Sequence, residues 1–463
     1  MASTEAKSTD ISGRMSTTIQ ALLPVAAATS QNHSLSDPNL IDVSQADNAL
    51  LHPELLGLCK DAISQRLSEE TFKYPTGFGG DPEMLQALSG FFNNYFRPAI
   101  PVTPEHLAIG AGVAYVNQEI QSLSPVLAGV CLSNIRTSLT RLLTGTDAFG
   151  AYFYINAGVQ LIPANPAPFK SALTAEVLLP AIENAYKSAP DLKRVKGLLI
   201  CNPHNPFGQS YSSEVLQDLL AWCAEKDIHY ISDEVYAGME YGTDAGNNEF
   251  VSVLALPVID SSSTVIRAED PDTLGDRKLL QRSRVHVLWS ASKLFGLPGI
   301  RLSWPADKIK GCLITQSNPM LRVGISLATY NQVSSLSSLF MTYLLNSPEL
   351  STLLKTNTSR IAKHYSLLSS TLRDLGVEFL PANSGFFVFA RLTTGNDSWE
   401  SEENIVKRLR EYGVLVSAGR EFGGSESEKG WVRITLAVPP EKFEESVKRI
   451  KRCLVEGSQG SSL

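Results

Sequence analysis

The sequence has no run of about 18 apolar residues, the length that a membrane-spanning helix needs. It has no long basic run either, and its formal net charge is −7, so a nucleic-acid or anionic-membrane partner is not expected. No C-x-x-C pair occurs, which removes the usual spacing of zinc and redox sites. We interpret the scattered cysteines as reduced thiols; they are Cys59, Cys131, Cys201, Cys223, Cys312 and Cys453.

The two ends of the chain have little apolar periodicity. Residues 1–38 are rich in Ser, Thr and Ala and are expected to form a flexible N-terminal arm. Within them, the apolar stretch 21–28 follows a long polar prelude and is interrupted by Pro24, so it makes a poor signal peptide. A cytoplasmic protein is the default expectation, and residues 456–463 are expected to form a flexible tail.

The composition is that of an ordinary globular chain, with 43% hydrophobic and 19% charged residues. A length of 463 residues fits roughly three domains, or one large α/β domain with a smaller partner. The second alternative is favoured because strand-like and helical patterns alternate between residues 195 and 233, whereas long helices follow residue 330. The expected large domain spans 71–330, and the small domain combines 39–70 with 331–455.

In the expected large domain, strands of the buried type precede polar motifs. Val195–Cys201 leads into Asn202–Gly208, and Ile228–Asp233 leads towards Tyr236, with an amphipathic helix at 212–225 between the two strands. Strand, helix and strand in this order predict parallel pairing with a right-handed crossover. The polar side chains then gather at the carboxyl ends of the strands, where open α/β sheets bind ligands.

Another strand-like run, Arg284–Trp289, leads into a stretch that contains Ser290, Ser292 and Lys293 and ends at Arg301. A lysine directly after a buried strand can be desolvated, which favours its neutral and nucleophilic form. The hydroxyls and the arginine offer hydrogen bonds and a fixed positive charge to a phosphate group. Pyridoxal 5'-phosphate needs this arrangement, although a surface lysine after a core strand is the alternative interpretation.

Three polar residues at strand ends suit the same cofactor. Asn205 and Tyr236 could hydrogen-bond a phenolate oxygen, and Asp233 could pair with a protonated ring nitrogen. Taken singly, an Asn-Pro pair is most often a turn, and a strand-end Asp is often a helix cap or a surface charge. Their occurrence together with Lys293, in this chain order, favours a cofactor site.

Two glycine-containing stretches could bring the backbone close to a ligand. The strand-like run His106–Ile109 continues into small residues, where an opening helix would present N–H groups to a phosphate. The loop Tyr74–Pro82 would also permit close approach, although a plain connector is an equal alternative. The phosphate contacts expected from the first stretch are Ala111, Gly112 and Val113.

The order of these motifs resembles the class I and II aminotransferases of fold type I. The motifs are Asn-Pro-x-Asn-Pro-x-Gly at 202–208, Asp-x-x-Tyr at 233–236 and Ser-x-Ser-Lys at 290–293, followed by Arg301. The Ala-Asp-Asn at 46–48 and the stretch after residue 284 are most similar to the aminocyclopropane-carboxylate synthase-like branch. The resemblance covers roughly residues 41 to 452, and it implies an α/β fold. Its large domain would contain a mostly parallel seven-stranded sheet, beside a smaller α+β domain.

The resemblance also implies roles for single residues. Lys293 would carry pyridoxal 5'-phosphate and move the proton between the substrate Cα and the cofactor. Arg433 would bind the substrate α-carboxylate with its planar fork, and Ala46 would lie beside the substrate; an exposed strand arginine is the alternative. The implied cofactor contacts are Ala111, Gly112, Val113, Asn205, Asp233, Tyr236, Ser290, Ser292 and Arg301, and no metal is implied.

The sequence departs from the family pattern in several places. No tyrosine within 142–149 aligns with the aromatic residue that stacks on the cofactor ring, and no clear strand is predicted over 140–150. Phe78 stands where the family has the tyrosine that reaches a partner subunit. Asp47 replaces the glutamate of the branch and is one methylene shorter, which argues against cyclopropane formation.

We therefore expect a pyridoxal-phosphate-dependent aminotransferase that acts on an α-amino acid or an amino-acid-derived metabolite, in specialised metabolism. The alternative is β- or γ-elimination by a carbon–sulfur lyase or a cyclopropane synthase-like enzyme, because the same cofactor serves both reactions. A minor alternative is a non-catalytic relative that kept the fold. The loop at 74–80, which in the family reaches a neighbouring subunit, predicts a homodimer.

Overall fold

The structure is a computed structural model, and it describes residues 39–74, 77–110, 140–144, 159–242, 248–259, 265–266, 280–298, 311–315, 318–330, 332–393, 398–422 and 428–459. The expectations for the arm 1–38, for Ala111–Val113 and for Arg301 lie outside these residues. None of the described helices is long and apolar enough to cross a membrane. In the same part of the chain, no group of His, Cys, Asp and Glu is placed to hold a metal ion.

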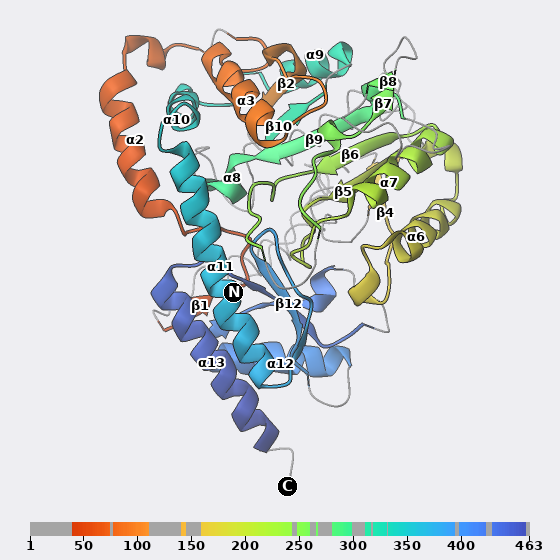
Figure 1. Cartoon of the computed structure of the whole chain (residues 1–463), viewed down its shortest axis with the longest axis vertical. Coiled ribbons are helices and arrows are strands. Elements are labelled where there is room, and N and C mark those ends of the chain that lie inside the picture. The colour runs from red at the N-terminus through yellow and green to blue at the C-terminus, as the bar shows by residue number, and fades with distance from the viewer. Residues whose placement is uncertain are drawn as a thin grey trace, which may run out of the picture.

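A seven-stranded sheet, here called the larger sheet, lies at the centre of the upper part of the molecule (Figure 1). Strand β10 runs antiparallel to both of its neighbours, and the other neighbouring strands pair in parallel. The prediction of a mostly parallel sheet of this size is confirmed. In spatial order the strands are β2 (Leu107–Gly110), β10 (Gly311–Ile314), β9 (Val285–Ser290), β6 (His229–Asp233), β5 (Val195–Cys201), β3 (Thr140–Thr144) and β4 (Val159–Pro163).

Strand β3 corrects the sequence analysis, which found no clear strand over 140–150. Its residues Thr140–Thr144 pair in parallel with β4 on one side and with β5 on the other. These hydrogen bonds come from segments distant in sequence, so the local pattern contains little of the signal that makes this segment a strand.

The central strands are apolar because both of their faces are covered. Every residue of β6 and β9 is buried, and in β5 only Lys196 is partly exposed. Such strands read as continuous hydrophobic runs rather than as alternating ones, which is why the sequence located them. The helices α6 (Ala175–Lys187) and α7 (Ser213–Lys226) lie beside this part of the sheet in Figure 1.

Helix ends follow ordinary capping chemistry. The side chain of Ser212 accepts a hydrogen bond from Val215 N at 3.3 Å at the start of α7, and Asp81 does the same for Met84 N at 3.0 Å at the start of α3 (Pro82–Tyr95). Helix α7 ends at Asp227, whose left-handed backbone (φ 59°) terminates the hydrogen-bonding pattern. Helix α7 therefore begins and ends within one residue of the predicted helix at 212–225.

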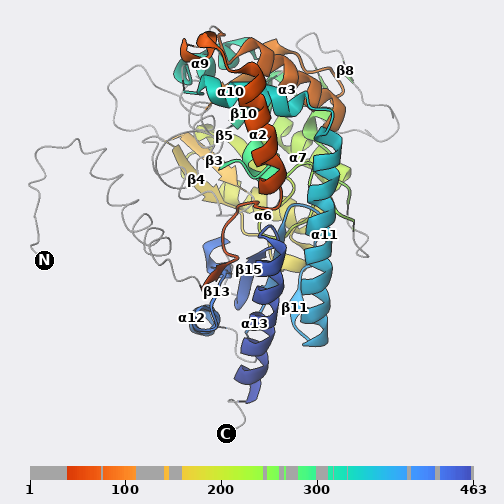
Figure 2. The same ribbon diagram turned by 90° about the vertical axis from the view of Figure 1, so that its left-hand side faces the viewer.

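A second sheet of four antiparallel strands, here called the smaller sheet, lies below the larger one in Figure 1. Its spatial order is β11 (Glu378–Phe379), β12 (Phe387–Arg391), β15 (Trp431–Thr435) and β14 (Ser417–Ala418). Long helices pack beside it, and α11 runs alongside α13 (Figure 2). These helices are α11 (Leu350–Asp374), α12 (Trp399–Glu411) and α13 (Pro440–Gln459). Helix α13 continues to Gln459, so the first part of the predicted tail is helical.

The first described residues connect the two sheets. Strand β1 (Ile41–Asp42) pairs in parallel with β13 (Val414–Leu415), next to the smaller sheet. Helix α2 (His52–Arg66) then contacts α10, which also contacts α3, beside the larger sheet. The division of the chain at residues 70 and 330 stays a prediction. The bounds of the other helices here are α3 (Pro82–Tyr95), α9 (Pro319–Ala328) and α10 (Ser335–Leu345).

Short elements complete the description. An antiparallel pair, β7 (Val258–Ile259) and β8 (Val265–Ile266), lies between β6 and β9 along the chain. Among the described residues, the 3-10 helices are η1 (Glu69–Phe72), η2 (Pro104–His106), η3 (Phe169–Ser171), η4 (Leu192–Arg194), η5 (Val253–Ala255), η7 (Arg282–Arg284) and η9 (Gly419–Phe422).

An aromatic cluster joins the smaller sheet to the segments that follow β4 and β5. Phe169 lies within 5.8 Å of the rings of Phe207, Phe389 and Trp431, measured between ring centroids. The Glu428 carboxylate accepts hydrogen bonds from Phe169 N and from the Trp431 indole, both at 3.1 Å. This packing holds the residues after the larger sheet's strands against β12 and β15.

Candidate active site

Lys293 lies on a single turn of helix, α8 (Ala291–Leu294), directly after β9. Its side chain is buried, and its Nζ donates a hydrogen bond to the carbonyl oxygen of Ala46 at 2.7 Å. The Ser290 hydroxyl caps the turn by accepting a hydrogen bond from Ser292 N at 3.1 Å. The structure therefore brings Lys293 and Ala46 together, and it excludes the alternative of a surface lysine.

Asp233 ends β6, the strand that pairs with β9. Burial raises the pKa of its carboxyl to about 7, while the Val235 N–H at 3.4 Å and the positive charge of Lys293 act in the opposite direction. A buried carboxyl with so little hydrogen bonding strongly prefers either a proton or a cationic partner. The structure thus places Asp233 near Lys293 in a state suited to pairing with a positively charged group.

Asn205 and Tyr236 follow β5 and β6 and lie beside the smaller sheet. The Asn205 side-chain oxygen accepts a hydrogen bond from Arg433 Nη1 at 2.9 Å. The Tyr236 ring is buried and packs edge-to-face against Phe386 and Phe387, at centroid distances of 5.5 and 5.4 Å. Both residues therefore lie where the loops of the larger sheet meet β12 and β15.

Arg433, in the middle of β15, is only 6% exposed, which excludes the alternative of an exposed strand arginine. Its Nη2 donates to the carbonyl oxygen of Ser44 at 2.6 Å and to the Ser417 hydroxyl at 3.3 Å. The guanidinium packs against the rings of Phe387 and Phe422, at 4.4 and 4.6 Å from their centroids. These contacts fix the plane of the guanidinium and remove it from bulk water, which strengthens its interaction with a carboxylate.

The structure describes only part of the predicted phosphate region, namely the residues at the ends of β2 and β9. Ser290 and Gly110 both pair with Gly311 of β10, so β9 and β2 end at the same level of the larger sheet. Ser292 is buried, and its hydroxyl has no hydrogen-bond partner among the described residues. A buried hydroxyl without a partner is costly, and a bound acceptor such as a phosphate oxygen would satisfy it. The residues present therefore fit pyridoxal 5'-phosphate at both its ring-nitrogen and its phosphate end.

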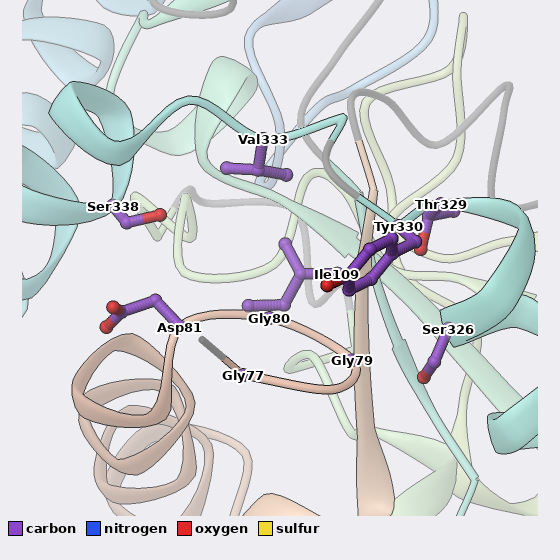
Figure 3. A pocket seen from close by; sticks show the side chains of 10 residues that line it. All are labelled: Gly77, Gly79, Gly80, Asp81, Ile109, Ser326, Thr329, Tyr330, Val333 and Ser338. Atoms are coloured by element: carbon purple, nitrogen blue, oxygen red, sulfur yellow. The ribbon is translucent and has the colours of Figure 1, made fainter. Parts of the chain in front are cut away.

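The glycine loop before α3 packs against the larger sheet and α9 (Figure 3). The Gly79 carbonyl accepts a hydrogen bond from Ile109 N at 2.9 Å, and a Cβ at Gly79 (φ 89°) would lie 2.9 Å from the Ser326 hydroxyl. The glycines therefore permit close backbone packing within the chain. A small pocket beside them is lined by Gly77, Gly79, Gly80, Asp81, Ile109, Ser326, Thr329, Tyr330, Val333 and Ser338.

Several contacts of the site were missed by sequence reasoning. Ser44 and Ser417 hold Arg433, and Asn48 and Asn357 hold the backbone beside Lys293. The Ala-Asp-Asn motif pointed to the neighbourhood of Asn48, but no local pattern indicated the other three. The aromatic residue expected to stack on the cofactor falls at 142–149, of which the structure describes only β3 residues.

The larger sheet, its strand order and the lysine at the end of β9 define the fold of pyridoxal-phosphate-dependent aminotransferases of fold type I. An aspartate aminotransferase mutant from Thermus thermophilus, described as complexed with tryptophan, matches with a TM-score of 0.69 at 18% identity, covering 96% of this chain and 99% of that chain. This likeness concerns the fold alone.

The family model described as "Aminotransferase class I and II" matches residues 150–450. A probable aminotransferase, aclI, from Aspergillus oryzae is 35% identical over 447 residues, which are 96% of this chain and 98% of the relative. The chain therefore belongs to the class I and II aminotransferases, a family of pyridoxal-phosphate-dependent enzymes. The mouse 1-aminocyclopropane-1-carboxylate synthase-like protein 1 is 27% identical over 420 residues, covering 87% of this chain and 75% of the relative, and this supports the resemblance to that branch.

Proposed function

We propose that this chain binds pyridoxal 5'-phosphate on Lys293 and transfers the amino group of an α-amino acid or an amino-acid-derived metabolite to a keto acid. The observation that carries the proposal is the segment Ser44–Ala46, whose carbonyl groups accept from Arg433 and from Lys293 respectively. Because Ser44 and Ala46 are only two residues apart, their Cα atoms are at most roughly 7 Å from each other. Arg433 and Lys293 therefore reach the same short segment, and a small molecule whose carboxylate adjoins its reacting carbon, such as an α-amino acid, suits a site of this kind.

Each polar residue then has a distinct task. The cofactor, when bound, supplies an electron sink that makes the substrate Cα–H acidic. Arg433 binds the α-carboxylate and orients the Cα, while the buried Lys293 holds and moves the proton that leaves it. Asp233 would pair with positive charge at the ring nitrogen, Asn205 and Tyr236 would hydrogen-bond the ring oxygen, and Ser290 and Ser292 would hold the phosphate. Ala111, Gly112, Val113 and Arg301 complete the proposed phosphate contacts.

The test begins with cofactor binding. Purified protein mixed with pyridoxal 5'-phosphate should become yellow, and borohydride reduction should fix the cofactor covalently on Lys293, as located by peptide mass spectrometry. Colourless protein with no labelled Lys293 would sink the proposal. A panel of amino acids and amino-acid-derived metabolites, each with keto-acid acceptors, then distinguishes the reactions: keto-acid exchange supports amino transfer.

A second candidate function is β- or γ-elimination at the same site. It is favoured by Asp47, an exposed carboxylate directly after the carbonyl group that receives Lys293 Nζ, where an acid could assist a leaving group. Release of ammonia with pyruvate, or release of a thiol, in the same panel would support elimination and count against amino transfer. An inert but yellow protein would favour the non-catalytic alternative.

We also propose that the chain forms a homodimer through the face that carries the glycine loop. Large apolar side chains are exposed there on η1, on the loop and on α9, and a monomer rarely exposes such a set without a partner. The Ser335 hydroxyl donates to the Lys73 carbonyl at 3.3 Å, which joins α10 to the loop. The exposed residues are Phe72, Tyr74, Phe78, Leu327 and Tyr330, with Tyr74 82% exposed.

Sedimentation velocity tests the dimer. The wild type should sediment as a dimer, and a Phe78→Ser, Tyr330→Ser variant should dissociate at lower concentration, since it loses apolar surface from the interface. A fully active wild-type monomer would contradict both the dimer and the contribution of the loop to a neighbouring site. Within the proposed function, the partners are thus a small-molecule substrate and a second copy of this chain.

A further inference from the structure

Two buried asparagines, Asn48 and Asn357, hold the backbone of the helical turn that carries Lys293. Asn48 Nδ2 donates to the Lys293 carbonyl at 3.0 Å and to the Leu294 carbonyl at 3.3 Å. Asn357 Nδ2 donates to the same Leu294 carbonyl at 3.2 Å. The two side chains also contact each other, since Asn48 Nδ2 lies 3.1 Å from Asn357 Oδ1. Neither residue is more than 1% exposed.

These two amides supply hydrogen-bond donors to carbonyl groups at the end of α8. A helix this short leaves its last carbonyl groups without partners in the helix, and a buried carbonyl without a partner is costly. The Asn48 side chain is itself fixed, because its oxygen accepts from Leu50 N at 3.1 Å. The carbonyl group of Lys293 is thus held by a side chain that cannot rotate without breaking further hydrogen bonds.

The backbone around Asn48 also meets the turn directly. A Cβ at Gly296 (φ 63°) would lie 1.7 Å from the Asn48 carbonyl oxygen, so only glycine fits this crossing. The His52 ring nitrogen Nε2 lies 2.9 Å from the Gly296 carbonyl oxygen. With the bond from Lys293 Nζ to Ala46, the segment 46–52 touches the lysine turn at its ammonium, at its carbonyl and at its end.

The same segment is attached to the smaller sheet. Thr435 N donates to the Val43 carbonyl at 2.9 Å, and Ala49 N donates to the Ala437 carbonyl at 2.8 Å. Both contacts flank the end of β15, the strand that carries Arg433. The segment around Asn48 therefore connects the strand of Arg433 to the turn of Lys293. Asn357, in the middle of α11, contacts both Asn48 and this turn.

We propose that Asn48 and Asn357 are positioning residues, forming a clamp that sets the placement of Lys293 relative to Arg433. The proposal rests on the proposed function for the role of Lys293 in moving the substrate proton. Neither asparagine touches the substrate; both act through the lysine backbone. A displacement of about 1 Å in a reacting group costs on the order of a hundredfold in rate, so a backbone clamp of this kind affects turnover more than binding.

The kinetic test uses Asn48→Ala and Asn357→Leu, the second of which keeps the side-chain volume and removes the donor. We expect kcat to fall roughly 10- to 100-fold in each, with the KM of the amino-acid donor within about threefold, because Arg433 keeps its own contacts. In the double variant the losses should be less than multiplicative, since the two amides share the Leu294 carbonyl and each other. An unchanged kcat per folded molecule in both single variants overturns the proposal.

A second readout needs no cofactor and no activity. In the apoprotein, a small amine-acylating reagent reaches a buried lysine only when its surroundings open, so the labelling rate measures local opening. Peptide mass spectrometry should show Lys293 labelled at least about threefold faster in Asn48→Ala than in the wild type, at every pH from 6 to 9. Asn48→Ser, which disturbs the packing less, serves if the alanine variant does not fold.

The matched control is Asn93→Ala. Asn93, on α3, also holds backbone with its amide, donating to the Val102 carbonyl at 2.9 Å and accepting from Val102 N at 2.7 Å. It should lose comparable stability without changing Lys293 labelling or kcat. Equal labelling in Asn48→Ala, Asn93→Ala and the wild type overturns the clamp. A wild type without amino transfer would instead overturn the proposed function, and the labelling result would stand.

Discussion

The two sheets contribute opposite kinds of side chain to the site. On the larger sheet, Asp233 receives one backbone donor at 3.4 Å, and the Ser292 hydroxyl has no partner among the residues that the structure describes. On the smaller sheet, Arg433 has two protein acceptors on Nη2, a third on Nη1 and two aromatic rings with centroids 4.4 and 4.6 Å from its guanidinium. Among the described residues, Asp233 and Ser292 thus have few hydrogen-bond partners, whereas the two terminal nitrogens of Arg433 have several.

The difference indicates how each half works. Buried polar groups with few hydrogen-bond partners are stabilised most when a ligand supplies the missing partners. The larger sheet is therefore suited to a cofactor that stays bound. A guanidinium held in one plane loses little freedom when it meets a carboxylate, so the smaller sheet is suited to a substrate that comes and goes. The predictions below test this division, in order of decreasing effect.

The largest effect is expected from Lys293→Ala. Removal of the amine removes both the attachment of the cofactor and the group that moves the substrate proton, so kcat should fall by at least about a thousandfold. The measurement is single-turnover kinetics with the best donor from the panel. Lys293→Arg keeps a charge towards Ala46 and should be equally inactive; a variant retaining a tenth of the activity would show that Lys293 does not react.

Asp233→Asn should lower kcat roughly 100-fold or more, because the amide cannot stabilise positive charge at the ring nitrogen. The matched control is Glu234→Gln. Glu234 is the next residue, and burial likewise raises the pKa of its carboxyl to about 7, but its oxygens accept from the Ser252 hydroxyl at 2.6 Å and from Val253 N at 3.0 Å. The control should lose stability and keep turnover. Equal loss of kcat in both variants would show that Asp233 has no specific role at the ring nitrogen.

The pH dependence of stability in the apoprotein should also reveal the raised pKa of Asp233. Since the folded state holds its proton up to about pH 7 and the unfolded chain releases it near pH 4, the folded state binds more protons between these values. The free energy of unfolding therefore falls as pH rises through this window. Relative to Asp233→Asn, the wild type should lose on the order of 3 kcal/mol from pH 4 to pH 7, as measured by urea unfolding. A constant difference would show that Asp233 is not desolvated.

The smallest effect is expected from Arg433→Lys, which keeps the charge and loses the fork. The KM of the amino-acid donor should rise about tenfold, with kcat changed less, because a lysine cannot bind a carboxylate through two parallel hydrogen bonds. Arg391→Lys is the control: Arg391 lies on β12, 5.1 Å from the Trp431 ring, and pairs with Glu428 at 3.0 Å. If both substitutions raised the KM equally, Arg433 would not be the residue that binds the substrate carboxylate.

Local sequence pattern predicted the part of the site that lies at the ends of buried strands. The runs before Asn205, Asp233 and Lys293 are apolar because their strands are covered on both faces, and the polar residue that follows each run marks the sheet edge. The same reasoning failed at Thr140–Thr144, whose pairing comes from β4 and β5 rather than from its own pattern.

Contacts between distant segments could not be predicted in this way. Arg433 and Ser44 are 389 positions apart, and Asn48 and Asn357 are 309 apart. Nothing in the residues around Asn357 distinguishes a clamp from a buried polar position in a long helix. Sequence resemblance identified Arg433 itself, but the rings and hydroxyl that orient it follow only from the packing of the two sheets.

The pairing of β1 with β13 has a consequence for the order of assembly during synthesis. Lys293 and the strands of the larger sheet leave the ribosome well before Val414–Leu415 and Thr435, to which residues 41–43 must attach. Domains tend to fold as they emerge, N-terminal parts first. The segment that carries Ala46 and Asn48 is among the first described residues made, yet it acquires its final place among the last. Until the C-terminal segments arrive, the nascent chain holds an incompletely enclosed lysine, and only the finished polypeptide possesses a working centre.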